Sequence, residues 1–247
     1  MLVTGAASGI GAATCTTLAA EGCHVAGMDR QADALAVIMQ QLRDAGQVAV
    51  SATADVSAWA QVEPAVAAAA RELGGLDAAV NVAGIGTFTG DIVATSPADW
   101  RAVIDIDLSG VFYVSRAVVP FLRRSGGGAI VNISSQYGLV GCADSPAYCT
   151  AKAGVIGLTR AMAVDHAHEG IRVNCVCPGP ISTPMLAANA TQADAGTRER
   201  ARVQGRVLLG HPGRPEDVAA LIAFLLSAEA TNMTGSVVTI DGGWTAG

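Results

Sequence analysis

The chain has 247 residues, of which 51% are hydrophobic and 15% charged, and its formal net charge is −6. The length suits one large domain with a sizeable core, and no apolar run reaches the roughly 18 residues that cross a bilayer, so we expect no membrane partner. The negative charge argues against a nucleic-acid partner, and no segment resembles a secretory signal, so we expect a cytoplasmic protein.

Strand-like and helix-like segments alternate along the chain. Strands are predicted at residues 1–4, 23–29, 48–56, 76–82, 129–134, 171–176 and 237–240. Helices are predicted at 10–21, 32–45 and 58–73, within 97–124, from 145 to 169, and at 215–227. Apolar strands without polar alternation, each followed by a helix, indicate a parallel sheet covered on both faces. The sequence therefore predicts an α/β fold with a doubly wound parallel sheet of about seven strands in a single domain.

A polar segment at residues 184–210 interrupts this alternation. Its length and polarity predict a lid that closes over the substrate. Its arginines could meet an anionic substrate, although a solvated helical face is the favoured interpretation. They are Arg198, Arg200, Arg202 and Arg206.

Six cysteines and four histidines are scattered along the chain. Without a secretory signal, reduced thiols are favoured over disulfides. Cys175 and Cys177 lack a second ligand pair at zinc-site spacing, and the histidines form no His-Glu-x-x-His motif, so no metal site is predicted.

The first motif is a glycine-rich turn, Thr4-Gly-Ala-Ala-Ser-Gly-Ile-Gly11, between the first strand and the first helix. Its glycines allow a sharp turn and a close approach to a pyrophosphate, which the free N–H groups and dipole of the helix N-terminus would bind. The sequence therefore predicts a dinucleotide site here. Its members are Gly5, Ser8, Gly9, Ile10 and Gly11.

Three further strand ends carry candidate cofactor contacts. Asp29 ends the second strand, where a carboxylate can accept hydrogen bonds from both ribose hydroxyls and would repel a 2′-phosphate. Because the glycine turn contains no basic residue, NAD is favoured over NADP, while Arg30 leaves NADP open. The remaining predicted contacts are Asp55 and Val56, beside the adenine, and the small-residue segment with Asn81, Ala83 and Gly84.

The catalytic candidates surround the only lysine of the chain, Lys152. Tyr148 lies four residues earlier on the same predicted helix and shares a face with it, and Ser135 ends the preceding strand. Free tyrosine has a pKa of about 10, which a nearby ammonium and an oxidised nicotinamide would lower. Tyr148 could then act as general acid/base while Ser135 holds the same substrate oxygen.

Together these motifs resemble the short-chain dehydrogenase/reductase family over essentially the whole chain. The matching elements are the glycine turn, the Asn81–Gly84 segment and the set Ser135, Tyr148 and Lys152. The resemblance implies a Rossmann-type fold and a homotetramer built through the long helices that contain Asp107 and Tyr148. It also implies nicotinamide contacts from one segment and a substrate pocket. These residues are Pro178, Gly179, Ile181 and Thr183 for the cofactor, and Gln136, Tyr137 and Cys142 for the substrate.

The chain departs from the family pattern at three places. Only three residues precede Thr4, and Val82 replaces the second Asn of the Asn-Asn-Ala-Gly element. Asp107 stands where the family has an active-site Asn. The backbone role of that position survives the change, but a carboxylate near Lys152 could raise the lysine pKa and weaken its effect on Tyr148. We expect an active enzyme with a modified proton relay, unless Asp107 is protonated or turned away.

The leading interpretation is an NAD-dependent oxidoreductase that transfers a hydride between the cofactor and a small secondary alcohol or ketone. One alternative is an NADPH-dependent 3-oxoacyl-thioester reductase, against which Asp29 argues. A second is a catalytically silent dinucleotide-binding protein, for which Asp107 is the sole support. The length leaves no room for the separate substrate domain of an extended sugar epimerase.

Overall fold

Seven parallel strands form one sheet in the computed structural model, which describes residues 1–86, 88–191 and 205–247. The strands are β1 (Leu2–Thr4), β2 (Val25–Asp29), β3 (Ala49–Thr53), β4 (Ala78–Asn81), β5 (Gly128–Ile133), β6 (Ile171–Pro178) and β7 (Val237–Ile240). Their order is β3-β2-β1-β4-β5-β6-β7. From β1 the chain therefore adds β2 and β3 on one side, and then crosses to add β4 to β7 on the other side. The direction of the strand order changes between β1 and β4, and ligands bind at this position in such sheets.

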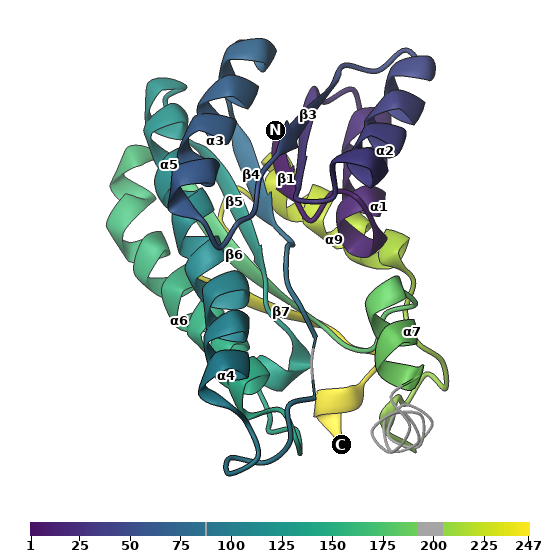
Figure 1. Ribbon diagram of the computed structural model, residues 1–247. Helices are drawn as coiled ribbons and strands as arrows, with labels where there is room; N and C mark the ends of the chain where they lie inside the picture. Colours follow the sequence, from purple (N-terminus) through teal and green to yellow (C-terminus); the bar gives the residue numbers. More distant parts are fainter. Residues whose placement is uncertain (87, 192–204) are drawn as a thin grey trace.

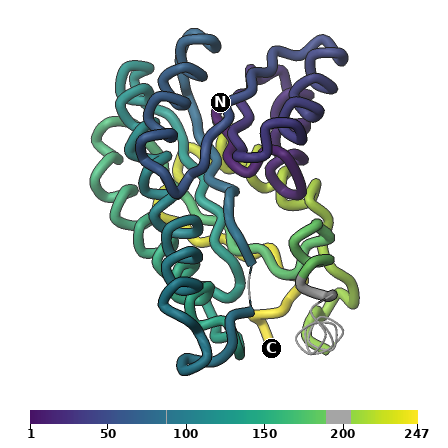
Figure 2. Tube along the Cα trace, viewed as in Figure 1, coloured from purple at the N-terminus to yellow at the C-terminus, as the bar shows by residue number. Residues whose placement is uncertain are grey.

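Helices cover both faces of the sheet (Figure 1). One layer contains α1 (Gly9–Ala20), α2 (Ala32–Asp44) and α9 (Pro215–Leu226), and the other contains α3 (Trp59–Leu73), α5 (Gly110–Arg124) and α6 (Pro146–His166). Two shorter helices, α4 (Pro97–Ile104) and α7 (Pro184–Thr191), lie toward the end of the molecule where the strands finish. Segments from opposite ends of the chain, α1 and α9, pack side by side (Figure 2).

The hydrophobic core has two parts, one on each face of the sheet, because successive side chains of a strand point to opposite faces. Leu2 and Ile130 pack with α3, α5 and α6, whereas their neighbours Val3 and Val131 pack with α1, α2 and α9. All four side chains are fully buried. Successive strand residues point to opposite faces, so a sheet covered on both sides requires the near-continuous apolar strands of this sequence. The predicted doubly wound parallel sheet is confirmed.

The predicted long helix within residues 97–124 is interrupted. It consists of α4, a π-helical turn at Asp105–Ser109 and α5. A π-helical turn adds a residue to the helix and changes the rotation of the next helical segment, and such turns are frequent at functional sites. The periodicity of apolar residues did not reveal it.

The structure describes only part of the predicted lid at residues 184–210. Its first residues form α7, and Arg206 is described, while Arg198, Arg200 and Arg202 lie outside the described residues. Within the described part of the chain, no helix is long and apolar enough to span a membrane.

Candidate active site

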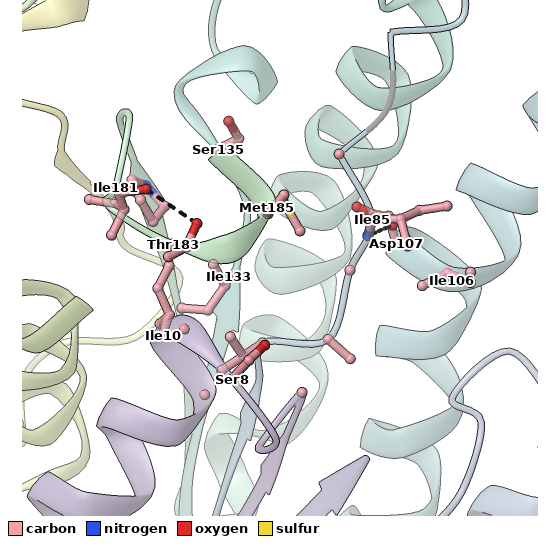
Figure 3. A pocket seen from close by; sticks show the side chains of 18 of the residues that line it. Ser8, Ile10, Ile85, Ile106, Asp107, Ile133, Ser135, Ile181, Thr183 and Met185 are labelled. Carbon is pink, nitrogen blue, oxygen red and sulfur yellow. Dashed lines mark hydrogen bonds between the residues drawn. The ribbon is translucent and has the colours of Figure 1, made fainter. Parts of the chain in front are cut away.

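A cavity of about 710 Å³ opens at the carboxyl ends of the strands. Its walls come from the segments that follow β1 to β6, together with α6 and α7. Figure 3 shows Ser8 and Ile10 at one end and Ser135 at the other, with Asp107 on one wall and Thr183 opposite. This size and position suit a dinucleotide together with a small substrate.

The glycine turn forms the floor of the cavity. Gly5 and Gly9 have φ values of +66° and +52°, a backbone conformation that favours glycine. A Cβ on Gly11 would collide with the carbonyl oxygen of Gly5. Ser8 precedes α1 without a side-chain cap, so the N–H groups of the first helical turn remain available to a ligand. This cradle fits a pyrophosphate.

Asp29 ties the end of β2 to the glycine turn. Its Oδ2 accepts a hydrogen bond from Ala7 N at 3.1 Å, and its Oδ1 accepts one from Gln31 N at 2.9 Å. Asp29 lines the cavity, and each carboxylate oxygen can accept a further hydrogen bond. Asp55 is held similarly by Ser57, whose hydroxyl donates to Oδ1 at 2.7 Å and lowers the pKa of the carboxyl.

Two predicted residues do not line the cavity. Asn81 is buried beneath it, where its Nδ2 donates to Asn132 Oδ1 at 2.8 Å and to Ser115 Oγ at 3.1 Å. The half-buried Cys142 donates its thiol hydrogen to the carbonyl of Ala143 at 3.4 Å. Asn81 points into the core because it is the last residue of β4 and still follows the alternation of that strand.

The other predicted contacts all line the cavity. The dinucleotide candidates among them are Gly5, Ser8, Gly9, Ile10, Gly11, Asp29, Asp55, Val56, Ala83 and Gly84. The catalytic, nicotinamide and substrate candidates among them are Asp107, Ser135, Gln136, Tyr137, Tyr148, Lys152, Pro178, Gly179, Ile181 and Thr183. The fold therefore brings the dinucleotide, catalytic and substrate candidates into one cavity.

Lys152 and Asp107 form a buried ion pair. Lys152 Nζ lies 3.1 Å from Asp107 Oδ2, and their side chains are 4% and 0% exposed. The ammonium also donates to the carbonyl of Ile133 at 3.3 Å, and Asp107 Oδ1 accepts from Ile85 N at 2.8 Å. A Cβ on Gly84 would lie 3.0 Å from Asp107 Oδ2, so the pair is closely enclosed. The carboxylate is turned toward the lysine.

The ion pair sets the charges around Tyr148. The lysine ammonium lies 5.5 Å from the centre of the Tyr148 ring. Burial raises the pKa of Tyr148, Lys152 lowers it, and the Asp107 carboxylate raises it, with a net increase. Burial alone would lower the pKa of Lys152, but Asp107 and Tyr148 together raise it. Asp107 thus favours a charged lysine while opposing formation of the phenolate.

Three supporting residues were not identified from the sequence. Thr4 Oγ1 accepts hydrogen bonds from Val82 N at 3.0 Å and Ala83 N at 3.1 Å, which joins the glycine turn to the segment after β4. Ser134 Oγ donates to the carbonyl of Lys152 at 2.7 Å. Ser145 directly precedes α6, makes no side-chain cap hydrogen bond and lines the cavity. The only sequence signal for Thr4 and Ser134 is that each lies directly before a predicted site residue, Gly5 and Ser135.

Comparisons with known proteins cover nearly the whole chain. A family model described as Enoyl-(Acyl carrier protein) reductase matches residues 5–245. The chain is 43% identical over 245 residues to cis-4-hydroxycyclohexanecarboxylate dehydrogenase of Sinomonas cyclohexanicum, covering 99% of this chain and 96% of that protein. It is 38% identical over 248 residues to cyclohexanol dehydrogenase of Acinetobacter sp. (strain SE19), with 99% and 94% covered. The crystal structure of levodione reductase matches with a TM-score of 0.95 at 35% identity, with 99% and 96% covered.

Proposed function

Because the chain belongs to the short-chain dehydrogenase/reductase family, we propose that Tyr148 is the general acid/base of an enzyme that interconverts small secondary alcohols and ketones. The observation that carries this proposal is the position of Tyr148 on the cavity wall, 5.5 Å above the buried Lys152 ammonium. The bound nicotinamide dinucleotide supplies or accepts the hydride.

The side chains of the cavity account for the proton transfer. In alcohol oxidation, ionised Tyr148 accepts the hydroxyl proton, and in ketone reduction the phenol returns it to the carbonyl oxygen. The Ser135 hydroxyl donates a hydrogen bond to the same oxygen and orients it. The Lys152 ammonium stabilises the phenolate. The segment with Pro178, Gly179, Ile181 and Thr183 holds the nicotinamide end.

Asp29 supports a preference for NAD over NADP. A carboxylate at the end of β2 repels a 2′-phosphate. We expect kcat/KM with NAD⁺ to exceed that with NADP⁺ by at least about tenfold, since like charges in a binding site cost several kcal/mol. The measurement is a titration of both cofactors with a panel of cyclic and linear secondary alcohols, which also tests the proposed function.

Asp29→Asn should reduce this cofactor preference toward unity. Asp33→Asn, on the adjacent helix α2, is the matched control and should keep the wild-type ratio. A preference for NADP⁺ in the wild type, with turnover of 3-oxoacyl thioesters, would support the alternative reductase. Dinucleotide binding without turnover of any alcohol or ketone would support a silent binding protein.

Asp107 is proposed to modify the proton relay through its ion pair with Lys152. Oxidation needs the Tyr148 phenolate, so kcat/KM rises with pH as the phenol ionises. Asp107→Asn removes a negative charge that raises the pKa of Tyr148. The rising limb of the pH profile should therefore move to lower pH. Steady-state measurement of kcat/KM against pH checks this expectation.

Asp105→Asn is the matched control for that pH profile. Asp105 lies in the same π-helical turn but is exposed, so its profile should follow the wild type. An unchanged profile in Asp107→Asn would show that the carboxylate does not alter the relay.

The substrate class, assembly and location are proposed from the relatives and from surface features. The relatives named for cyclohexanol and cis-4-hydroxycyclohexanecarboxylate support a ring alcohol as substrate. Pro184, Met185 and Leu186 of α7 are proposed to form part of the substrate wall.

The exposed apolar residues Phe112 and Val164, on α5 and α6, support a homotetramer built through these helices. Six free thiols support a cytoplasmic location.

A further inference from the structure

The side-chain amide of Gln136 is buried at the cavity without an assigned role in the proton transfer. Gln136 is 2% exposed, lines the cavity, and its Oε1 atom has no hydrogen-bond partner among the described residues. Buried polar atoms without partners destabilise a fold, and each one in a native structure requires an explanation such as a ligand or a water molecule. Its place on the cavity wall makes the bound substrate the natural partner.

The backbone around Gln136 is fixed by other contacts. Its carbonyl oxygen accepts hydrogen bonds from Leu139 N and Val140 N, both at 3.0 Å. The preceding residue, Ser135, accepts a hydrogen bond from Tyr137 N at 3.1 Å through its side chain. The Tyr137 ring packs edge-on against the buried Trp244, with the ring centres 6.0 Å apart. The amide therefore extends from a rigid turn directly after Ser135.

Ser145 contributes a second polar group to the same cavity. It is 3% exposed and lines the cavity, and its side chain makes no cap hydrogen bond to the first turn of α6. Ser135 and Tyr148 engage one oxygen of the substrate in the proposed function. Gln136 and Ser145 are therefore available to bind another oxygen of the substrate.

The charges of the cavity are placed unequally between its two ends. Among the described lining residues, Asp29 ends β2, Arg30 follows β2 and Asp55 follows β3, all at the dinucleotide end. The remaining charges belong to the buried ion pair. An amide offers both a donor and an acceptor, which matches a hydroxyl or a carbonyl oxygen. A carboxylate group on the substrate would be bound better by a cationic side chain than by an amide.

We propose that Gln136 binds a second, neutral oxygen of the substrate, so that the preferred substrates are diols, hydroxyketones or diketones on a small ring or a short carbon chain. This inference rests on the proposed function and specifies its substrate class. The Gln136 Nε2 group donates to that oxygen, and Oε1 accepts from it when it is a hydroxyl. The apolar side chains of Ile85, Phe88 and Met185 line the same cavity and provide contact for the carbon skeleton.

The test compares cyclohexanol with the isomeric cyclohexanediols in the wild type and in Gln136→Leu. A site that hydrogen-bonds a substrate hydroxyl rejects the analogue that lacks it, so wild-type kcat/KM for the best diol should exceed that for cyclohexanol by at least about tenfold. In Gln136→Leu the diol-to-cyclohexanol ratio should fall close to unity. Gln41→Leu is the matched control, because Gln41 is exposed on α2, and it should keep the wild-type ratio.

A second measurement does not depend on turnover. The best diol should raise the Tm of wild-type protein loaded with the dinucleotide, and this shift should be lost in Gln136→Leu. The variant itself should be at least as stable as the wild type without substrate, because it removes an unpartnered buried acceptor.

Several results would overturn the inference. They are equal kcat/KM values for diols and cyclohexanol, an unchanged ratio in Gln136→Leu, a preference for 4-hydroxycyclohexanecarboxylate over every diol, and failure of Gln136→Leu to fold, which would make the amide a structural group. Absence of turnover with any alcohol or ketone contradicts the proposed function instead, and the Tm shift then still decides the role of Gln136.

Discussion

Replacing Tyr148 with phenylalanine is expected to lower kcat by about 10²–10⁴-fold, the usual contribution of a general acid/base. The substitution removes only the hydroxyl and keeps the ring above Lys152. Dinucleotide affinity should therefore change little, because the glycine turn and Asp29 lie at the other end of the cavity. Steady-state kinetics and a cofactor-binding titration measure the two effects separately.

Tyr113→Phe is the matched control for this variant. Tyr113 lies on α5 and packs against Trp59, with the ring centres 6.0 Å apart, and it does not line the cavity. Its loss of the hydroxyl should leave kcat within about twofold of the wild type, as expected for a substitution outside the site. If Tyr148→Phe retained more than a tenth of the wild-type kcat, another group would have to carry the proton.

The second large effect is expected from Lys152→Arg, which keeps the positive charge. The Lys152 ammonium fits between Asp107 and the Ile133 carbonyl, beside Gly84. A planar guanidinium is larger and cannot occupy that space as a compact charge beneath Tyr148. We expect a loss in kcat of about 10²-fold or more and a destabilisation of about 1–3 kcal/mol from overpacking. Near-normal turnover would show that charge alone suffices.

A double variant separates stability from catalysis at this pair. Lys152→Met alone leaves the Asp107 carboxylate buried without a counter-charge, which typically costs about 3–5 kcal/mol. Combining it with Asp107→Asn should recover much of that stability, because both charges are then absent. Turnover should stay low in both variants, as the phenolate has lost its stabilising cation. Recovery of turnover in the double variant would contradict the role given to Lys152.

Much of the cavity was predictable because a parallel sheet places the residues after its strands at one edge. The glycine turn and Ser135 each follow a strand and Asp29 ends one, so the strand assignments alone predict that they lie at the same edge. Tyr148 and Lys152 were predictable as a pair from helical spacing. The predicted fold and family membership are confirmed, while the roles of these residues stay predictions.

Side-chain direction was less predictable than position. Asn81 ends β4 at the expected place, but the alternation of β4 turns its amide into the core, where the paired strand β5 places Asn132 beside it. Cys142 lies in a loop, where no periodicity indicates which way a side chain points. The closeness of Asp107 and Lys152 was expected from the family resemblance, but the π-helical turn that contains Asp107 was not, because a pattern of apolar residues does not register one additional residue in a helix.

That turn separates the helical phase of α4 from that of α5. The helix α4 packs against α6, which carries Tyr148, whereas α5 packs against α3 on the sheet. In an uninterrupted helix of 3.6 residues per turn, the direction of Asp107 would be locked to the packing of both neighbours. With the π-helical turn between them, the two packing surfaces tolerate different rotations. The rotation of α4 on α6 is thereby set separately from the rotation of α5 on α3.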